Sequence, residues 1–416
     1  MDAPDPSALR ALFPGLSRTL DGRPCVFADA PGGSQVPETV IGAMGSYLRT
    51  SNANLHGAFV TSRETDRLVD DARGAGADFV GAGPDEIVFG PNATTLLLSV
   101  TRSIARTLKA GDEIVVTRLD HDANVAPWLL VAEDTGAVVR HVDIRDQDVT
   151  LDLHSLDAAL SERTKIVAFT LASNAVGTIT PAAEISRRAH ESGAVVVMDA
   201  VHFAQHRLID VRAIEADVLV CSPYKFFGPH LGVLFGRREL LSTLRPYKVR
   251  PAPDEGPARW ETGTQSHEAL AGFIAAVDYL ADVGRTFGPA ASDDRRSLLT
   301  AAFETIGAYE RGLSERFLQG LASLPRVRLY GIDHPAEMDR RTPTFAVRVG
   351  DRHPADTAAA LGERGIFVWD GDYYAREVME RLGLASSGGA VRIGFCHYNT
   401  AQEVDRVLDE LEELSN

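Results

Sequence analysis

The hydrophobic positions of the chain follow a regular pattern from about Pro84 onward. Short runs rich in valine and isoleucine are typical of strands, and they alternate with stretches whose apolar residues recur at helical spacing. The expected strands are Glu86–Phe89, Glu113–Thr117, Ala137–Val142, Lys165–Leu171, Ala194–Met198, Asp217–Cys221 and Gly232–Phe235. The expected helices between them are Thr94–Thr107, Asn124–Asp134 and Ala182–Glu191.

Continuous apolar strands separated by helices predict an α/β fold with a mostly parallel sheet that is covered on both faces. The three strands from Ala194 on follow one another closely, so we expect some of them to pair antiparallel. The segment Pro246–Pro257 contains four prolines and no periodicity, which predicts a surface excursion.

The pattern changes again toward the C-terminus. Long helices are expected at His267–Val283 and Asp294–Ser323, followed by strands at Val327–Tyr330, Thr344–Val349 and Val391–Phe395. These elements are typical of a smaller α+β unit. We therefore predict a large domain of residues 25–285 and a small C-terminal domain of residues 286–416, on which residues 1–24 are expected to pack.

The last expected helix has a clear start and a clear apolar face. Thr400 and Glu403 have the spacing of a capping box, which marks a helix N-terminus. The apolar side chains after it recur at helical spacing, at Val404, Val407, Leu408, Leu411 and Leu414.

Composition and charge narrow the class of protein. A chain of 416 residues with 44% hydrophobic and 24% charged residues is typical of a globular protein with two or three domains. The 42 Lys and Arg residues against 58 Asp and Glu residues give a net charge of −16, which repels phosphate backbones, so no nucleic-acid partner is expected.

The absence of a membrane segment and of a signal peptide predicts the cellular compartment of the protein. No apolar run approaches the roughly 18 residues of a membrane helix, and the N-terminus has neither the basic start nor the apolar stretch of a signal peptide. Three widely spaced cysteines, Cys25, Cys221 and Cys396, suit free thiols in a reducing compartment. We expect a cytoplasmic protein without a membrane partner.

The segment Ser222–Gly232 contains the most informative motif. Lys225 lies in a loop directly after an apolar strand, between aromatic residues and glycines. Burying an ammonium is costly, and such surroundings lower the pKa of a lysine until it can attack a carbonyl. A lysine that extends from a strand end into solvent explains the same residues and stays open.

An aspartate precedes this lysine at the end of another strand. Asp199 follows the apolar strand Ala194–Met198, and open α/β sheets bind ligands at this edge. A lysine and an aspartate on neighbouring strands suit pyridoxal 5'-phosphate, because the lysine holds its aldehyde and the carboxylate keeps the pyridine nitrogen protonated. A helix N-cap is the alternative role of Asp199.

Two further segments fit the same cofactor. Gly90–Thr95 joins a strand to a helix and offers the free N–H groups that bind a phosphate, although Asn92 as an N-cap explains it equally. Asp120–Asn124 follows a strand and carries an imidazole that could face an aromatic ring. His202 and His206 are four residues apart but have no acidic partner that fits a zinc site, so no metal is expected.

These motifs, in this order, resemble the class V aminotransferase group of fold-type I pyridoxal phosphate enzymes, and most closely its cysteine desulfurase/selenocysteine lyase branch. The resemblance runs from about Asp29 to the C-terminus. It implies that Lys225 is the Schiff-base lysine, that Asp199 is the partner of the pyridine nitrogen, and that the imidazole of His121 stacks on the ring.

The resemblance also implies the remaining contacts of the cofactor. His202 stands where the family has a glutamine that binds the phenolic oxygen, and Tyr224 stands where it has a histidine just before the lysine. The N–H of Ala93 and the hydroxyls of Thr94 and Ser222 would hold the phosphate.

The family's substrate and subunit contacts also have counterparts. Arg392 matches the arginine that binds the substrate α-carboxylate, and Asn174 matches an asparagine near the cofactor and substrate. Thr264 matches a residue that reaches the phosphate of the partner subunit, so the resemblance implies a homodimer acting on a small amino acid.

The sequence departs from the desulfurases at their sulfur-accepting cysteine. The loop reads Gly371-Asp-Tyr-Tyr374-Ala, and Tyr374 stands where that cysteine is expected, while Trp369 replaces a second substrate arginine. A tyrosine cannot carry a persulfide, and Cys221 and Cys396 read as packing thiols.

These departures give three hypotheses. The leading one is a carbon–sulfur lyase that eliminates the β-substituent of an amino acid without a persulfide cysteine. The second is an aminotransferase, an epimerase or an enzyme of another α- or β-carbon transformation in secondary metabolism. The third is a binding protein that has lost catalysis, which the joint presence of Lys225, Asp199, His121 and Arg392 disfavours.

Overall fold

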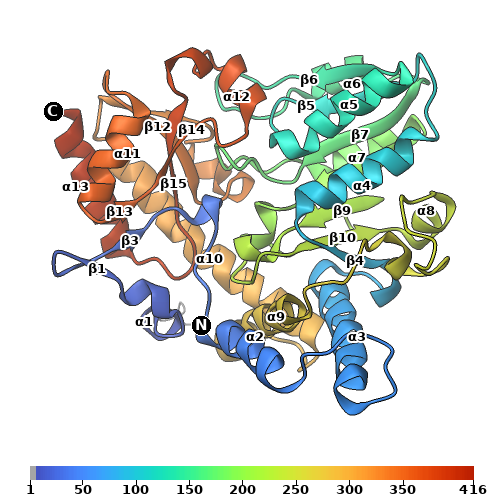
Figure 1. Ribbon diagram of the computed structural model, residues 1–416. Helices are drawn as coiled ribbons and strands as arrows, with labels where there is room; N and C mark the ends of the chain where they lie inside the picture. Colours follow the sequence, from blue (N-terminus) through green and yellow to red (C-terminus); the bar gives the residue numbers. More distant parts are fainter. Residues whose placement is uncertain (1–5) are drawn as a thin grey trace.

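A seven-stranded sheet forms the centre of the larger lobe in the computed structural model, which describes residues 6–416 (Figure 1). Its strands lie in the order β4-β10-β9-β8-β7-β5-β6. Their bounds are β4 Ile87–Gly90, β5 Glu113–Thr117, β6 Val138–Val142, β7 Thr164–Thr170, β8 Val195–Asp199, β9 Val218–Cys221 and β10 Gly232–Gly236.

The strand directions bring one set of loops together. Strand β10 is antiparallel to both of its neighbours, β9 and β4, whereas the pairs β9/β8, β8/β7, β7/β5 and β5/β6 are parallel. The expected antiparallel pairing in this region is therefore confirmed for β10. All the other strands end at the same edge of the sheet, where α/β folds bind their ligands.

The two faces of the sheet are covered by different helices because successive side chains of a strand point to opposite sides. On one face, Ile114 and Val116 pack with Leu97 of α4 and Trp128 of α5. On the other face, Val115 belongs to a second core that includes residues of α3, α7 and α9. The bounds of the larger lobe's helices are α2 Glu38–Thr50, α3 Val60–Val80, α4 Ala93–Ala105, α5 Ala126–Thr135, α6 Leu153–Ala159, α7 Ala182–Glu191, α8 Arg238–Thr243 and α9 His267–Phe287.

A four-stranded sheet of order β11-β12-β15-β14 forms the second lobe, on the left in Figure 1. Its strands are β11 Val327–Tyr330, β12 Thr344–Val349, β14 Trp369–Gly371 and β15 Ala390–Gly394, and its helices are α10 Arg295–Leu321, α11 Pro354–Glu363, α12 Arg376–Arg381 and α13 Ala401–Ser415. The capping box of Thr400 and Glu403 is confirmed at the start of α13. Its predicted apolar face packs on this sheet, with Leu408 only partly buried.

The N-terminal segment crosses between the two lobes. Strand β3 (Val26–Phe27) pairs in parallel with β13 (Ile366–Phe367), and Phe13 contacts Phe227 and Tyr398. Helix α1 (Pro6–Arg10) and the short hairpin of β1 (Thr19–Leu20) and β2 (Arg23–Pro24) precede β3. Residues 1–5 of the segment that we expected to pack on the small domain lie outside the described residues.

The predicted elements after Pro84 are present, and their bounds differ by a few residues. Helix α9 continues to Phe287, four residues beyond the expected end, because the chain has no proline until Pro289. Helix α5 begins at Ala126, because a separate 3₁₀ turn at Asp122–Asn124 precedes it. Among residues 6–416, none of the helices combines the length and the apolar character that a membrane crossing requires.

Candidate active site

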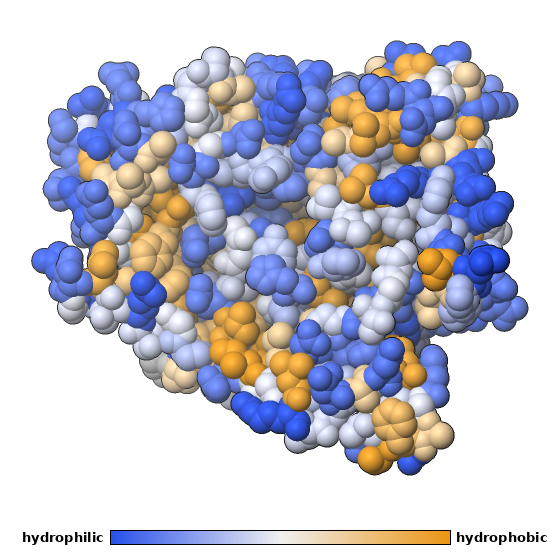
Figure 2. All heavy atoms as spheres, in the orientation of Figure 1, coloured by the Kyte–Doolittle hydropathy of each residue, from blue (hydrophilic) through white to orange (hydrophobic). Residues whose placement is uncertain are grey.

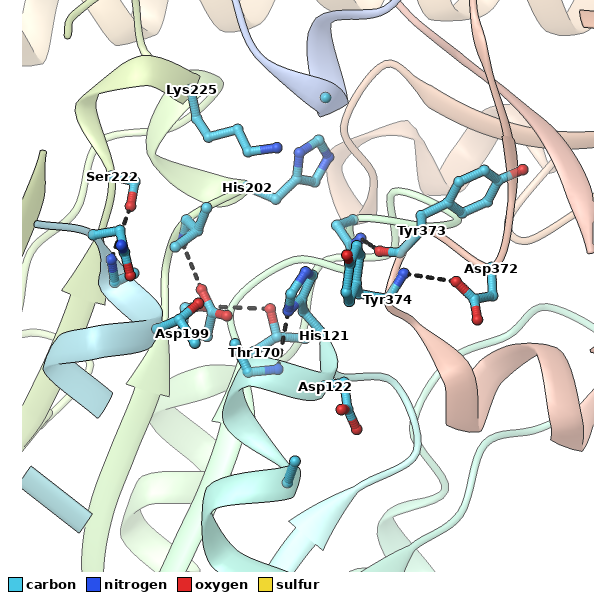
Figure 3. Close-up of a pocket in the computed structure, with 18 of the residues that line it drawn as sticks. His121, Asp122, Thr170, Asp199, His202, Ser222, Lys225, Asp372, Tyr373 and Tyr374 are labelled. Atoms are coloured by element: carbon cyan, nitrogen blue, oxygen red, sulfur yellow. Dashed lines mark hydrogen bonds between the residues drawn. The ribbon is translucent and has the colours of Figure 1, made fainter. Parts of the chain in front are cut away.

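A cavity of about 910 Å³ opens between the carboxyl edge of the large sheet and the loops of the second lobe. It contains every residue that the sequence predicted for the site except Thr264, which is exposed and lies outside the cavity lining. Figure 3 shows how side chains of both lobes converge there. The residues brought together are Ala93, Thr94, His121, Asn174, Asp199, His202, Ser222, Tyr224, Lys225, Tyr374 and Arg392.

Lys225 follows β9 in a 3₁₀ turn, and its side chain points into the cavity (Figure 3). The ammonium donates a hydrogen bond to the carbonyl of Pro31 at 2.5 Å, so it does not extend into solvent as a surface lysine would. Burial and the charge of Arg392 lower the pKa of Lys225 to about 7. A substantial fraction of the amine is therefore unprotonated and nucleophilic near neutral pH.

Asp199 is the last residue of β8, and its side chain is buried at the floor of the cavity. Its Oδ1 accepts a hydrogen bond from the N–H of Val201 at 2.8 Å. The next helical turn begins only at Phe203, so Asp199 is not a helix N-cap. Burial raises the pKa of Asp199 to about 6, while the nearby Lys225 lowers it.

The start of α4 provides the anion-binding end of the cavity. Asn92 caps the helix by accepting a hydrogen bond from the N–H of Thr95 at 2.8 Å, so the N-cap alternative is confirmed. The N–H of Ala93 donates a hydrogen bond to the hydroxyl of Ser222 at 3.2 Å, and both residues line the cavity together with Thr94, at a helix N-terminus that suits an anion. A Cβ at Gly232 would lie 2.5 Å from the carbonyl carbon of Asn92, so only glycine permits this close approach.

Two imidazoles line the cavity in neutral form. His121 follows β5, and its Nδ1 accepts a hydrogen bond from the N–H of Ala123 at 3.0 Å. Burial, together with Lys225 and Arg392, lowers the pKa of His121 to about 4. The Nε2 of His202 lies 3.1 Å from the hydroxyl of Thr342, whereas its buried Nδ1 has no hydrogen-bond partner among residues 6–416.

Arg392 of β15 brings a buried guanidinium to the second-lobe side of the cavity. It donates to the carbonyl of Asn174 at 2.9 Å and lies 4.5 Å from the centroid of the Tyr373 ring. Burial lowers its pKa to about 10, so the group stays charged at neutral pH. Within the described chain, the Nε of Arg392 and the Oδ1 of Asn174 are buried without partners, which leaves one donor and one acceptor for a ligand.

The loop that carries Tyr374 is held by several contacts. Tyr373 and Tyr374 both have left-handed backbone angles, with φ of 55° and 58°. The carbonyl of Tyr374 accepts a hydrogen bond from the N–H of Asp122 at 2.6 Å. Its ring stacks on His121 with centroids 5.5 Å apart and an interplanar angle of 20°, so the tyrosine lies beside the imidazole at the rim of the cavity.

The three cysteines are all buried, and none of them lines this cavity. Cys221 ends β9, and Cys396 follows β15. Burial raises the pKa of both thiols above the ordinary value, which opposes thiolate formation. The prediction that Cys221 and Cys396 are packing thiols is consistent with this environment.

Two residues of the N-terminal segment were missed as parts of the site. Asp29 lies near Arg392 and Lys225, and burial raises its pKa to about 6. Gly32 lines the cavity, and a Cβ there would lie 2.1 Å from the indole nitrogen of Trp369. The only signal for them was that the family resemblance began at Asp29, since this segment has no periodic pattern.

A lysine and a buried aspartate at the carboxyl ends of neighbouring parallel strands, with a helix N-terminus beside them, define a fold-type I pyridoxal phosphate enzyme. The chain belongs to the class V aminotransferase family, whose model, "Aminotransferase class-V", matches residues 26–407.

The sequence similarity to named relatives covers nearly the whole chain. A probable cysteine desulfurase of Streptomyces coelicolor is 34% identical over 99% of this chain and 97% of its own length. A cysteine desulfurase of Serratia proteamaculans is 30% identical over 98% of this chain and 97% of its own length. The solved apo structure of a cysteine desulfurase from Thermococcus onnurineus has a TM-score of 0.87 at 29% identity, and covers 100% of this chain and 98% of its own.

The residues of the cavity fit the cofactor of this family. Buried polar atoms without partners in the described part of the chain, such as His202 Nδ1 and Asn174 Oδ1, are costly unless a ligand binds them. The Ala93 N–H, the Ser222 hydroxyl and the helix α4 dipole suit a phosphate, and Asp199 suits a protonated pyridine nitrogen. The protein is a pyridoxal 5'-phosphate-dependent enzyme of the cysteine desulfurase-like type.

We expect Arg392→Lys to weaken substrate binding more than it slows turnover. Lysine keeps the charge but loses the planar pair of donors that grips a carboxylate, so kcat/KM should fall roughly 10²-fold, mainly through KM. Steady-state kinetics with an amino-acid substrate measure this change. Arg348→Lys on the neighbouring strand β12 is the control, since Arg348 lies outside the cavity lining and contacts the carbonyls of Ser387 and Gly389. An equal loss in both variants would contradict the assignment.

Proposed function

We propose that the protein is a carbon–sulfur lyase that eliminates a sulfur substituent from the β-carbon of an amino acid without forming a persulfide on a cysteine. The observation that carries this proposal is the identity of residue 374. A tyrosine stands where the resemblance to desulfurases would place their nucleophile, and none of the three cysteines lines the cavity.

The proposed substrate contacts follow from the polar groups on the second-lobe side. Arg392 would bind the α-carboxylate with its guanidinium, and the free Oδ1 of Asn174 would accept a hydrogen bond from the substrate. The substrate Cα would then lie toward Lys225. With a pKa near 7, the Lys225 amine is suited to take the α-proton and to return a proton later.

Each cofactor group has a proposed holder. Ala93, Thr94 and Ser222 would hold the phosphate, Asp199 the pyridine nitrogen and His202 the phenolic oxygen, while His121 and Tyr224 would flank the ring. The bound cofactor supplies an electron sink for the α-carbon, which makes loss of the proton and of the β-substituent feasible. We also propose a cytoplasmic homodimer without nucleic-acid or membrane partners, in which Thr264 reaches the phosphate of the partner subunit.

The proposal is tested by the products that the purified enzyme forms. We expect cysteine or an S-substituted cysteine, incubated with the enzyme and pyridoxal phosphate, to give thiol or sulfide together with pyruvate and ammonium in equal amounts. The elimination removes the α-proton and breaks the Cβ–S bond, and water hydrolyses the remaining enamine to pyruvate and ammonium. Pyruvate is quantified with lactate dehydrogenase and thiols with a chromogenic disulfide.

Two results would contradict this reaction. Alanine as the main product would mean that sulfur is transferred to an acceptor, as in a desulfurase. Amino transfer that depends on an added keto acid, without sulfur release, would instead support an aminotransferase. As a control for cysteine chemistry, pretreatment with iodoacetamide should leave the rate unchanged, because Cys25, Cys221 and Cys396 are all buried.

A further inference from the structure

The cavity has an apolar side that the proposed elimination does not use. Besides Ala93, Thr94 and Asp122, helices α4 and α5 and the turn before α5 contribute five aliphatic side chains to the lining. These side chains are Leu98, Ala123, Ala126, Pro127 and Leu130. Below they are called the apolar wall.

We propose that the substrate carries a bulky apolar group on its β-sulfur and that this group lies against the apolar wall. This inference rests on the proposed elimination and names its substrate class, an S-aryl- or S-alkyl-substituted cysteine. Free cysteine, which has only a thiol at this position, would leave the wall unused.

The size of the cavity supports a large substituent. Its volume of about 910 Å³ lies near the top of the range of roughly 300–1,000 Å³ that is typical of sites for drug-sized ligands. The groups proposed to hold the cofactor and the α-carboxylate lie at the ends of β8 and β9, on β15 and in the first turn of α4, whereas Leu98 and Leu130 lie farther along α4 and α5. The apolar wall therefore borders space in which a substituent on the β-carbon can extend.

Exposed apolar side chains at the rim point to the same conclusion. Leu130 is 53% exposed, Trp369 is 51% exposed and Tyr374 is 72% exposed, and all three line the cavity. Apolar surface gathered at the mouth of a cavity is typical of a binding site. Figure 2 shows hydrophobic side chains over α5 beside a hollow between the two lobes.

The rim aromatic Tyr374 lies beside the turn that leads into the apolar wall. The carbonyl of Tyr374 accepts a hydrogen bond from Asp122, the first residue of the turn that leads into α5. The Tyr374 ring stacks on His121, the residue just before this turn. An apolar substituent would thus meet the tyrosine ring at one end and Leu130 farther along α5.

The reaction balances without any added oxidant. S-phenylcysteine and one water give thiophenol, pyruvate and ammonium. The Cα–H and Cβ–S bonds break, the electron pair of the Cβ–S bond leaves with sulfur, and the thiolate takes up one proton. Addition of water to the remaining three-carbon enamine then replaces the C–N bond by a carbonyl.

Binding of analogues that cannot react isolates the apolar wall from the chemistry. Homophenylalanine is the carbon analogue of S-phenylcysteine, and 2-aminobutyrate is that of cysteine; neither carries a leaving group on its β-carbon. We expect calorimetry on the enzyme loaded with pyridoxal phosphate to show homophenylalanine binding about 10- to 100-fold more tightly, because its phenyl group becomes buried. Equal affinities would overturn the inference.

A matched pair of variants tests whether Leu130 causes the difference in affinity between the two analogues. Leu130→Ser is expected to lower this affinity ratio about three- to tenfold. Leu129→Ser should leave it unchanged, because Leu129 lies on the same helix, is 40% exposed and does not line the cavity. Similar effects of both substitutions would overturn the inference. So would a changed oligomeric state of Leu130→Ser with an unchanged ratio, which would assign this part of α5 to a subunit contact.

The elimination reaction and the apolar substituent can be refuted independently of each other. If homophenylalanine binds preferentially but S-phenylcysteine yields no pyruvate, the apolar substituent is supported and elimination is wrong. If pyruvate forms from cysteine while the two analogues bind equally, elimination is supported and the apolar substituent is wrong.

Discussion

Lys225→Ala should lower kcat/KM by roughly 10³-fold or more and remove the covalent attachment of the cofactor, because both the carbonyl-binding amine and the base for the α-proton are lost. The low pKa of this lysine follows from its burial and from Arg392, so a lysine elsewhere on the chain cannot take its place. The purified variant should lack the absorbance that the wild-type protein shows with its bound cofactor, and it should form no product in the pyruvate assay.

The lysine that binds the cofactor can be identified directly by experiment, because the chain has only four lysines: Lys109, Lys165, Lys225 and Lys248. Reduction of the loaded wild-type enzyme with borohydride, followed by peptide mass mapping, should place the cofactor on Lys225. Lys165→Ala is the matched control and should retain full activity, because the Lys165 ammonium contacts only the carbonyl of Glu162 outside the cavity lining. Cofactor found on another lysine would refute the assignment.

Asp199→Asn should keep the fold and the cofactor but lower kcat about 10²- to 10³-fold, as expected when one partner of a buried charged pair is removed. Asparagine has the same shape and can still accept the hydrogen bond from Val201, so the local structure is preserved. It lacks the negative charge that would keep the pyridine nitrogen protonated, and the electron sink is weakened.

The test of this prediction measures both the turnover of the variant and the absorption spectrum of its bound cofactor. The loaded Asp199→Asn variant should bind one cofactor per chain, as wild type does, while the absorption spectrum and its pH dependence change. Asp210→Asn, at a half-exposed aspartate that pairs with Arg296 away from the cavity, controls for the loss of one charge. Full activity of Asp199→Asn would show that another group protonates the nitrogen.

The parts of the site that follow strands were predictable from sequence. Each lies at the carboxyl end of a strand whose apolar run is unmistakable, and the edge of a parallel sheet brings such ends together. Asp199, Lys225 and His121 were found in this way. Arg392 was assigned only through the family resemblance, because an arginine in a strand has many other uses.

The parts that depend on contacts between distant segments were not predictable. Trp369 was noted only as a replaced arginine, yet its indole nitrogen lies so close to Gly32 that a methyl group there would clash. The stacking of Tyr374 on His121 joins residues of two lobes, and no local pattern encodes it. Asp29 lies in a segment whose strand has only two residues, too short to show a period.

The pairing of β3 with β13 has a consequence for synthesis on the ribosome. Residues 26–27 emerge first but find their strand partner at residues 366–367, and Gly394 then bonds to the carbonyl of Ala28. Contacts of such large sequence separation form late. All seven strands of the large sheet are made before residue 237, whereas the segment of Asp29 and Gly32 finds its partners only at residues 366–394. The catalytic cavity is therefore completed only after residues 366–394 have been synthesised.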